Sequence, residues 1–167
     1  ASPAIISDGA GGAIVTWHDS RGSDSDIYAQ RVLASGTVDP GWPINGLALC
    51  TAADAQQNPV LVSDGEGGAI VTWVDLRNGM GNSDIFAQHV LASGAVDPAW
   101  PVDGIALCEA PGPQMYLTMI SDGAGGAIVA WLDVRSVTSD IYAQHGLSTG
   151  VGDPDWNADG VALWLAV

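Results

Sequence analysis

The feature that most constrains the fold of this chain is a segment that occurs three times along it. The copies begin at Ser7, Ser63 and Ser121 and read SDGAGGAIVTWHDSRGSDSDIYAQ, SDGEGGAIVTWVDLRNGMGNSDIFAQ and SDGAGGAIVAWLDVRSVTSDIYAQ. Units that repeat at this spacing bury their apolar surfaces on one another, so the repeat decides the architecture before any single residue does. We expect one continuous array of three repeat units, at residues 1–58, 59–116 and 117–167.

Each unit is predicted to be a small antiparallel meander of four short strands. In the first unit the apolar runs lie at residues 3–6, 13–17, 26–33 and 46–50, and the glycine-rich segment 7–12 between the first two runs indicates a hairpin loop. The run AIVTW lacks polar alternation, which is typical of a strand covered on both faces. The third unit is expected to end in its own fourth strand at residues 161–167.

A comparison of the copies also leads to predictions for one loop and for the two cysteines. The second copy is longer between Trp73 and Asp84, and we expect its extra residues, in the loop 78–82, to lie on the surface. Cys50 and Cys108 occupy the same place in successive units, and Trp164 occupies it in the third. Equivalent positions of neighbouring units seldom approach to disulfide distance, so we expect two half-buried free thiols.

The chain is strongly acidic. Nineteen Asp and Glu residues stand against four basic residues, all arginine, and the formal net charge is −15 at pH 7. This charge repels phosphate backbones and anionic lipid, so nucleic acid and membrane surfaces are not expected as partners. No apolar run approaches the roughly 20 residues of a membrane span. The absence of lysine favours an extracellular or cell-surface location, with any signal peptide removed or outside this sequence.

The repeat also resembles a known class. The pattern SDGxGGAxVxWxDxR, then DIYAQ or DIFAQ, then a tryptophan and a glycine before an apolar strand, resembles the β-propeller-type repeats of large secreted bacterial surface proteins, which often carry a C-terminal sorting domain. The DPGW and DPAW segments are also similar to a second group of bacterial propeller repeats. The resemblance spans essentially the whole chain. It implies an all-β fold of propeller-blade-like units and implies no reaction.

Three blades are too few for a closed ring, because propellers usually have about four to eight. The chain is therefore expected to form an open arc whose first and last units expose apolar faces. Neighbouring copies could cover these faces, either by closing two chains into a ring or by building a filament, and further repeats of a longer parent chain could do the same.

The main candidate for chemistry is a Trp-x-Asp-x-Arg motif followed by a second aspartate. An arginine between carboxylates could bind an anionic or sugar ligand. Alternatively, an arginine held by two carboxylates and stacked on the tryptophan would join the second strand to the third, and we favour this structural role because the motif occurs once per unit. The residues are Trp17, Asp19, Arg21, Asp26, Trp73, Asp75, Arg77, Asp84, Trp131, Asp133, Arg135 and Asp140.

Other sites are weaker candidates. Asp19, Asp24 and Asp26 could bind calcium, although no copy has the spacing of a twelve-residue calcium loop; no other metal and no cofactor are predicted. Paired carboxylates could hydrolyse glycosides, but a catalytic pair is not expected in every repeat. His89 and His145 stand where the first unit has Arg31, which indicates a polar strand position.

The tryptophans before the fourth strands are compatible with two functions. Trp42 and Trp100 precede the fourth strand of their units and could stack on sugar rings, which would make the chain a lectin-like propeller, possibly assisted by calcium. The prediction we favour is packing between units. We expect a non-catalytic structural or adhesive protein that associates with itself, or with further repeats, through its end blades.

Overall fold

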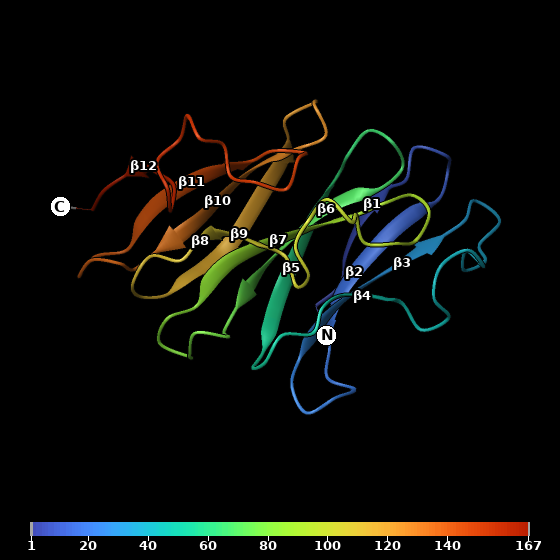
Figure 1. Ribbon diagram of the computed structural model, residues 1–167, viewed down its shortest axis with the longest axis horizontal. Coiled ribbons are helices and arrows are strands. Elements are labelled where there is room, and N and C mark those ends of the chain that lie inside the picture. Colours follow the sequence, from blue (N-terminus) through green and yellow to red (C-terminus); the bar gives the residue numbers. More distant parts are fainter. Residues whose placement is uncertain (1, 167) are drawn as a thin grey trace.

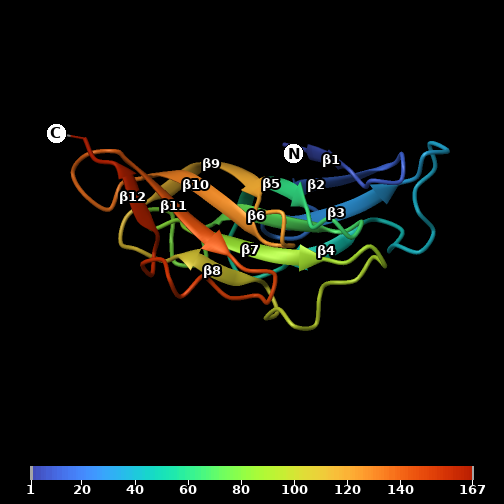
Figure 2. The ribbon, with the colours of Figure 1, turned by 90° about the horizontal axis from the view of Figure 1, so that it is seen from above.

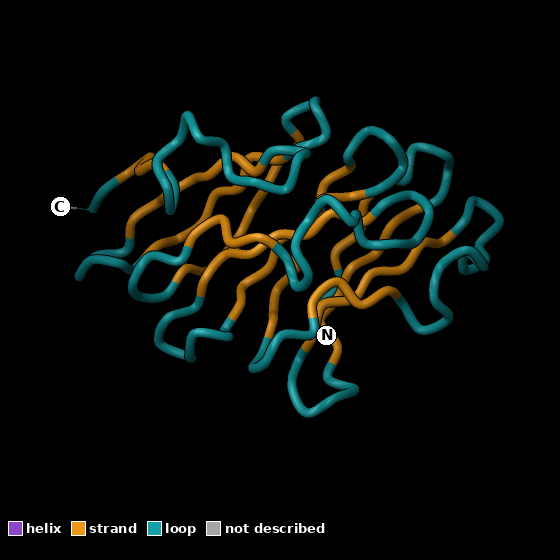
Figure 3. The backbone as a smooth tube through the Cα atoms, viewed as in Figure 1, coloured by secondary structure: helices purple, strands orange, loops and turns teal. Residues whose placement is uncertain are grey.

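The computed structural model describes residues 2–166 and is built entirely of β-strands and connecting loops in that range (Figures 1 and 3). The strands form three groups of four along the chain. They are β1 (Ala4–Ser7), β2 (Ala13–Asp19), β3 (Asp26–Val32), β4 (Leu47–Cys50), β5 (Gln56–Ser63), β6 (Ala69–Asp75), β7 (Asp84–Val90), β8 (Ile105–Cys108), β9 (Gln114–Ser121), β10 (Ala127–Asp133), β11 (Asp140–Gly146) and β12 (Val161–Trp164).

Each group is one antiparallel sheet whose strands are paired in chain order. The orders are β1-β2-β3-β4, β5-β6-β7-β8 and β9-β10-β11-β12. We call these the first, middle and third sheets. The three sheets follow one another through the molecule without closing into a ring (Figures 1 and 2). The predicted fold class, an open array of propeller-blade-like repeats, is therefore confirmed.

The hairpin between the first two strands is built as its sequence suggests. The Asp8 carboxylate accepts hydrogen bonds from the backbone N–H groups of Ala10 and Gly12, both at 2.8 Å. Gly11 has a φ of 85°, a left-handed conformation that glycine adopts without a steric penalty. The other two sheets repeat this turn around Asp64 and Asp122.

Some strand ends differ from the sequence prediction. The second strand continues past Trp17, because Asp19 pairs with Asp26 across the hairpin and keeps the ladder hydrogen-bonded to that point. The last strand ends at Trp164, and residue 167 lies outside the described range. The expected unit boundaries after residues 58 and 116 fall within β5 and β9, each of which has a register shift where it pairs with the next strand.

The sheets pack face to face through their first strands. Strand β5 lies against β1, β2 and β3, and β9 lies against β5, β6 and β7. Two apolar cores result. One joins the first and middle sheets through residues such as Ile14, Leu49 and Trp73, and the other joins the middle and third sheets through residues such as Ile70 and Trp131.

The middle sheet differs from its neighbours in burial. Every residue of β6 and β7 is buried. In β2 and β10 buried positions alternate with half-buried ones, because each outer sheet has a neighbour on one face only. The prediction that the AIVTW strand is covered on both faces is thus correct for the middle sheet and wrong for the first.

The cysteines and the longer loop can also be placed. Cys50 and Cys108 are free and fully buried, not half-buried as expected, and burial raises the pKa of each thiol to about 12. The longer loop of the second unit is exposed, with Met80 at its tip, which confirms the prediction for that loop.

Candidate functional site

The Trp-x-Asp-x-Arg motif forms a compact polar cluster at the end of the second strand. In the middle sheet, Trp73 Nε1 donates a hydrogen bond to Asp75 Oδ2 at 2.8 Å. Arg77 forms a fork with the same carboxylate, from Nε to Oδ1 at 2.9 Å and from Nη2 to Oδ2 at 2.7 Å. The third sheet has the same contacts among Trp131, Asp133 and Arg135.

The arginine stacks on a different ring from the one expected. The guanidinium carbon of Arg77 lies 3.9 Å above the ring of Phe86, the residue paired with Trp73 on the neighbouring strand. In the other sheets Arg21 lies over Tyr28 and Arg135 over Tyr142. Each motif arginine forms an ion pair with one carboxylate, not two. The motif still joins the second strand to the third, through the aromatic residue of the third strand.

The motif also connects neighbouring sheets. Nη2 of Arg77 lies 3.3 Å from Sγ of Cys50 in the first sheet and donates to the Asp103 carbonyl at 2.9 Å. Arg135 contacts Cys108 and the Asp159 carbonyl in the same way. Arg21 donates to the Asn45 carbonyl, but its sheet has no preceding neighbour. Its side chain is 39% exposed, against 23% for Arg77.

The second aspartate of each motif lies apart from the arginine ion pair. Asp84 Oδ2 accepts a hydrogen bond from Asn78, whereas its Oδ1 is buried without a partner. Burial raises the pKa of Asp84 to about 6. Asp140 accepts hydrogen bonds from Ser136 and Thr138. The expected arrangement of two carboxylates around one arginine is therefore wrong.

The calcium candidates are distributed over the exposed loop of the first sheet. Asp19 binds Trp17 and Arg21, and these hydrogen bonds hold its pKa well below the usual range. Asp24 accepts a hydrogen bond from Ser23. The pKa of Asp26 is raised by burial and by Asp24. Between residues 2 and 166, no three His, Cys, Asp or Glu side chains gather in an arrangement that could hold a metal ion.

A second repeated cluster was not anticipated from the sequence. His89 Nε2 lies 3.0 Å from Asp64 Oδ2 and its Nδ1 lies 2.9 Å from Asp97 Oδ2. His145 bridges Asp122 and Asp153, and Arg31 bridges Asp8 and Asp39. Each bridge connects the glycine-rich hairpin, the third strand and the segment before the fourth strand. The sequence signal was present, since the basic position and both aspartates recur in every copy.

The pKa of His145 shows the electrostatic balance in this cluster. Burial by itself lowers the pKa, but the hydrogen bonds to Asp122 and Asp153 outweigh burial and raise it overall. The pKa of Asp153 is lowered, first by the backbone N–H of Asp155 and then by His145. Because Arg31 fills the same place in the first sheet, the position accommodates a cation held between two carboxylates.

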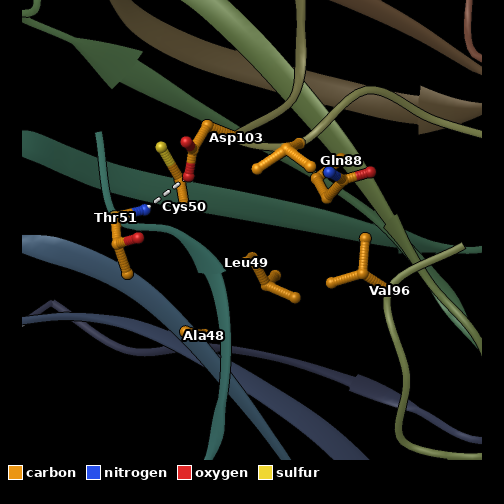
Figure 4. A pocket seen from close by; sticks show the side chains of 8 residues that line it. Ala48, Leu49, Cys50, Thr51, Gln88, Val96 and Asp103 are labelled. Carbon is orange, nitrogen blue, oxygen red and sulfur yellow. Dashed lines mark hydrogen bonds between the residues drawn. The ribbon is translucent and has the colours of Figure 1, made fainter. Parts of the chain in front are cut away.

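A crevice also recurs at the two junctions between sheets. One of about 200 Å³ lies between the first and middle sheets, where the Thr51 N–H donates to Asp103 Oδ1 at 2.8 Å and Val96 and Val102 line the wall (Figure 4). The equivalent crevice between the next two sheets has about 420 Å³, because Gly152 and Ala158 replace the two valines. A crevice present at both junctions is a feature of how the sheets pack.

Trp42 and Trp100, the candidates for sugar stacking, are each only 4% exposed. Both lie in the cores between sheets and do not present a ring face to solvent.

No protein family and no curated protein matches this chain. In the part of the chain that the structure describes, no helix is long and apolar enough to cross a membrane.

Proposed function

We propose that this chain is a non-catalytic structural or adhesive protein that associates, through the open faces of its first and third sheets, with further sheets of its own kind. The main observation that supports the proposal is the difference in burial between the middle sheet and the two outer sheets. The middle sheet is covered on both faces by neighbouring units, whereas each outer sheet has one face free.

The open face of the third sheet is apolar. Ile120 and Leu163 are 64% and 61% exposed, and with Ile128 and Ala130 they line a shallow groove of about 200 Å³. Their counterparts in the middle sheet face the third sheet: Val62 and Ile70 belong to the core there. Apolar surface of this kind is stabilised by burial, at about 25 cal/mol for each Å² removed from water.

The open face of the first sheet is the counterpart of the face by which the middle sheet meets the first. Ile5 is 67% exposed at the position of Leu61, which is 7% exposed. Val15 and Trp17 are half-buried where Val71 and Trp73 are completely buried. Each copy therefore presents both halves of an interface that already occurs twice within the chain, and head-to-tail association yields a ring or a filament.

The chemistry of the repeated motif supports a structural role over catalysis. The first aspartate of each motif forms an ion pair with the motif arginine in all three sheets, and a contact repeated once per unit is typical of a residue that stabilises the unit. The thiols of Cys50 and Cys108, with a pKa of about 12, are protonated at neutral pH and are poor nucleophiles. The acidic composition and the lack of lysine support a place outside the cell or on its surface.

Sedimentation velocity over a range of protein concentrations tests this function. We expect species larger than one 167-residue chain, and electron microscopy of negatively stained samples should show rings or filaments. Ile120→Asp, which places a charge on the open face, should produce monomers. Val137→Asp is the control because Val137 is fully exposed in a loop. A wild-type chain that stays monomeric at every concentration contradicts the proposal.

Glycan binding stays a separate prediction. The burial of Trp42 and Trp100 leaves the partly buried Trp17 and Trp156 and the exposed Trp164 as rings that could meet a sugar. A glycan array, probed with and without calcium, tests this function. Binding that is lost in a Trp164→Ala variant would favour the lectin over the structural role.

A further inference from the structure

The tryptophan before the fourth strand of each sheet reaches into the next sheet. Trp42 Nε1 donates to the Ala92 carbonyl at 3.3 Å, and Trp100 Nε1 donates to the Ser148 carbonyl at 3.1 Å. Both indoles are 4% exposed. Each junction between sheets therefore contains a tryptophan from one unit that is docked onto the turn after the third strand of the following unit.

The receiving turn carries a glycine whose missing side chain makes room for the indole. Gly94 has a φ of 81°, and a Cβ built on it would lie 2.7 Å from Cδ1 of Trp42. Gly150 has a φ of 78°, and its Cβ would lie 2.9 Å from Cδ1 of Trp100. Contacts this short do not occur between real atoms, so any side chain at either glycine displaces the tryptophan.

One equivalent tryptophan, Trp156, and one equivalent glycine, Gly36, do not form this contact within the chain. Gly36 has a φ of 81°, as Gly94 has, yet a Cβ built on it would meet nothing within 4 Å. Trp156 packs on the ring of His145, with centroids 6.0 Å apart, as Trp100 packs on His89 at 5.9 Å. Trp156 is nevertheless only partly buried, because no fourth sheet follows among the described residues to supply a receiving turn.

A backbone hydrogen bond also recurs at both junctions. The donor and the acceptor positions for a third bond of this kind lie at opposite ends of the chain. Thr51 N–H donates to Asp103 Oδ1, and Glu109 N–H donates to Asp159 Oδ1, both at 2.8 Å. Asn45 holds the place of these aspartates in the first unit, and Leu165 holds the place of the donors after the third sheet. An asparagine Oδ1 accepts a backbone hydrogen bond as a carboxylate oxygen does.

We propose that Trp156 of one copy docks onto the turn at Gly36 of a second copy, with its Nε1 donating to the Ala34 carbonyl. In the same contact the Leu165 N–H of the first copy donates to Asn45 Oδ1 of the second. This inference rests on the proposed self-association and identifies which residues determine its register. The occupant is a second copy of this chain, because the contact continues a junction that the chain already forms twice.

The end junction also departs from the internal ones in the residue that lies beside the motif arginine. Trp164 stands where Cys50 and Cys108 stand, and these sulfurs contact Arg77 and Arg135. In the docked pair the Trp164 side chain takes the place of the sulfur beside Arg21. The arginine is 39% exposed in the isolated chain, so it has room to move when the larger ring arrives.

The sharpest test is the substitution Gly36→Asn. Asparagine tolerates the left-handed conformation, and a Cβ at this position has nothing within 4 Å in the isolated chain but would overlap a docked Trp156. We expect the dissociation constant, measured by sedimentation, to rise at least about tenfold. Gly9→Asn is the matched control, since Gly9 has a φ of 75° with open space around it, and its counterparts Gly65 and Gly123 are open as well.

Trp156→Ala tests the other half of the contact and allows a mixing experiment. Removal of a central tryptophan should weaken association about 30-fold. Each variant alone should be monomeric where the wild type assembles. A mixture of Trp156→Ala and Gly36→Asn chains retains one intact junction, between Trp156 of the second variant and Gly36 of the first. The mixture should give one-to-one dimers and nothing larger.

The outcomes separate this inference from the proposed function. If the wild-type chain is monomeric, both are overturned. If the wild type assembles and the Gly36→Asn and Trp156→Ala chains assemble equally well, the function stands and this contact is wrong. If Gly9→Asn weakens assembly as much as Gly36→Asn does, the mixing experiment decides, because a capped dimer requires the intact Trp156 and Gly36 to meet.

Discussion

The middle and first sheets contain the same pentapeptide, AIVTW, in two different environments. In β6 all five residues are buried, whereas in β2 only Ile14 and Thr16 are. Val71 is completely buried, and its counterpart Val15 is half-buried. The difference does not arise from the pentapeptide. It arises from the number of neighbouring sheets, which is two for the middle sheet and one for the first.

The largest expected effect comes from the two equivalent tryptophans of this pentapeptide. Trp73→Ala should cost about 3–5 kcal/mol of unfolding free energy, as is usual for a buried aromatic residue. Trp17→Ala should cost less than half as much, because Trp17 is only half-buried. Urea unfolding at low protein concentration measures both losses. Equal losses would mean that the first sheet is packed as tightly as the middle one.

The motif arginines of the first and middle sheets should differ in the same direction. Arg77→Ala leaves the fully buried Asp75 carboxylate without its ion pair and should cost about 2–3 kcal/mol. Arg21→Ala removes a more exposed pair and should cost less than Arg77→Ala, because exposed ion pairs contribute little to stability. Thermal unfolding of the two variants side by side provides the measurement. An unchanged melting temperature for Arg77→Ala would show that the motif does not hold the sheet together.

A smaller effect should appear at the buried carboxylate of the middle sheet. Because the pKa of Asp84 is raised from 3.8 to about 6, the folded state binds this proton more tightly than the unfolded state does. Its contribution to stability is complete below about pH 4 and is lost as the pH rises through 6. Asp84→Asn avoids that loss and should stabilise the chain at pH 7 by about 1 kcal/mol, after allowance for solvent screening.

The comparison for this prediction is Asp26→Asn in the first sheet. Asp26 is only partly buried, so its substitution should change stability at pH 7 by less than that of Asp84. Unfolding free energies at pH 4 and pH 7 distinguish the two positions. An Asp84→Asn chain that keeps the wild-type pH dependence would falsify the assignment of that dependence to Asp84.

The smallest expected effect concerns the basic residue that lies between two aspartates, which is Arg31 in the first sheet and His145 in the third. The pKa of His145 is raised above 6.5, so its contribution to stability is complete below pH 6.5 and is lost as the pH rises through the raised value. His145→Arg keeps the charge at all these pH values, as Arg31 does in the first sheet. Between pH 6 and pH 9 the wild type should lose stability relative to this variant, by less than the difference expected for Asp84→Asn. If the unfolding free energies of the wild type and the His145→Arg variant change with pH in parallel, the titration of His145 does not affect stability in this range.

The repeat pattern predicted the strands more successfully than the side-chain contacts. The alternation of glycine-rich turns and apolar runs is local, so the four-strand meander could be inferred from one unit. The stacking of Arg77 on Phe86 depends on the register that pairs Trp73 with Phe86, and local sequence does not specify that register. The bridge from His89 to Asp64 joins residues 25 positions apart, and it becomes visible only when the third strand folds beside the hairpin.

The sequence by itself determined the number of units, their strand order and the placement of Trp, Asp and Arg once in each unit. Strands that follow one another through short turns pair with their neighbours in the chain, so each unit can be recognised from its own residues. Tertiary structure alone decided which copies are buried, which tryptophans are docked and which glycines are left open. Trp42 and Trp156 hold the same place in their units, and only Trp42 has a following sheet to receive it. Burial depends on neighbours in space, which an identical segment acquires in the middle of the array and lacks at its ends.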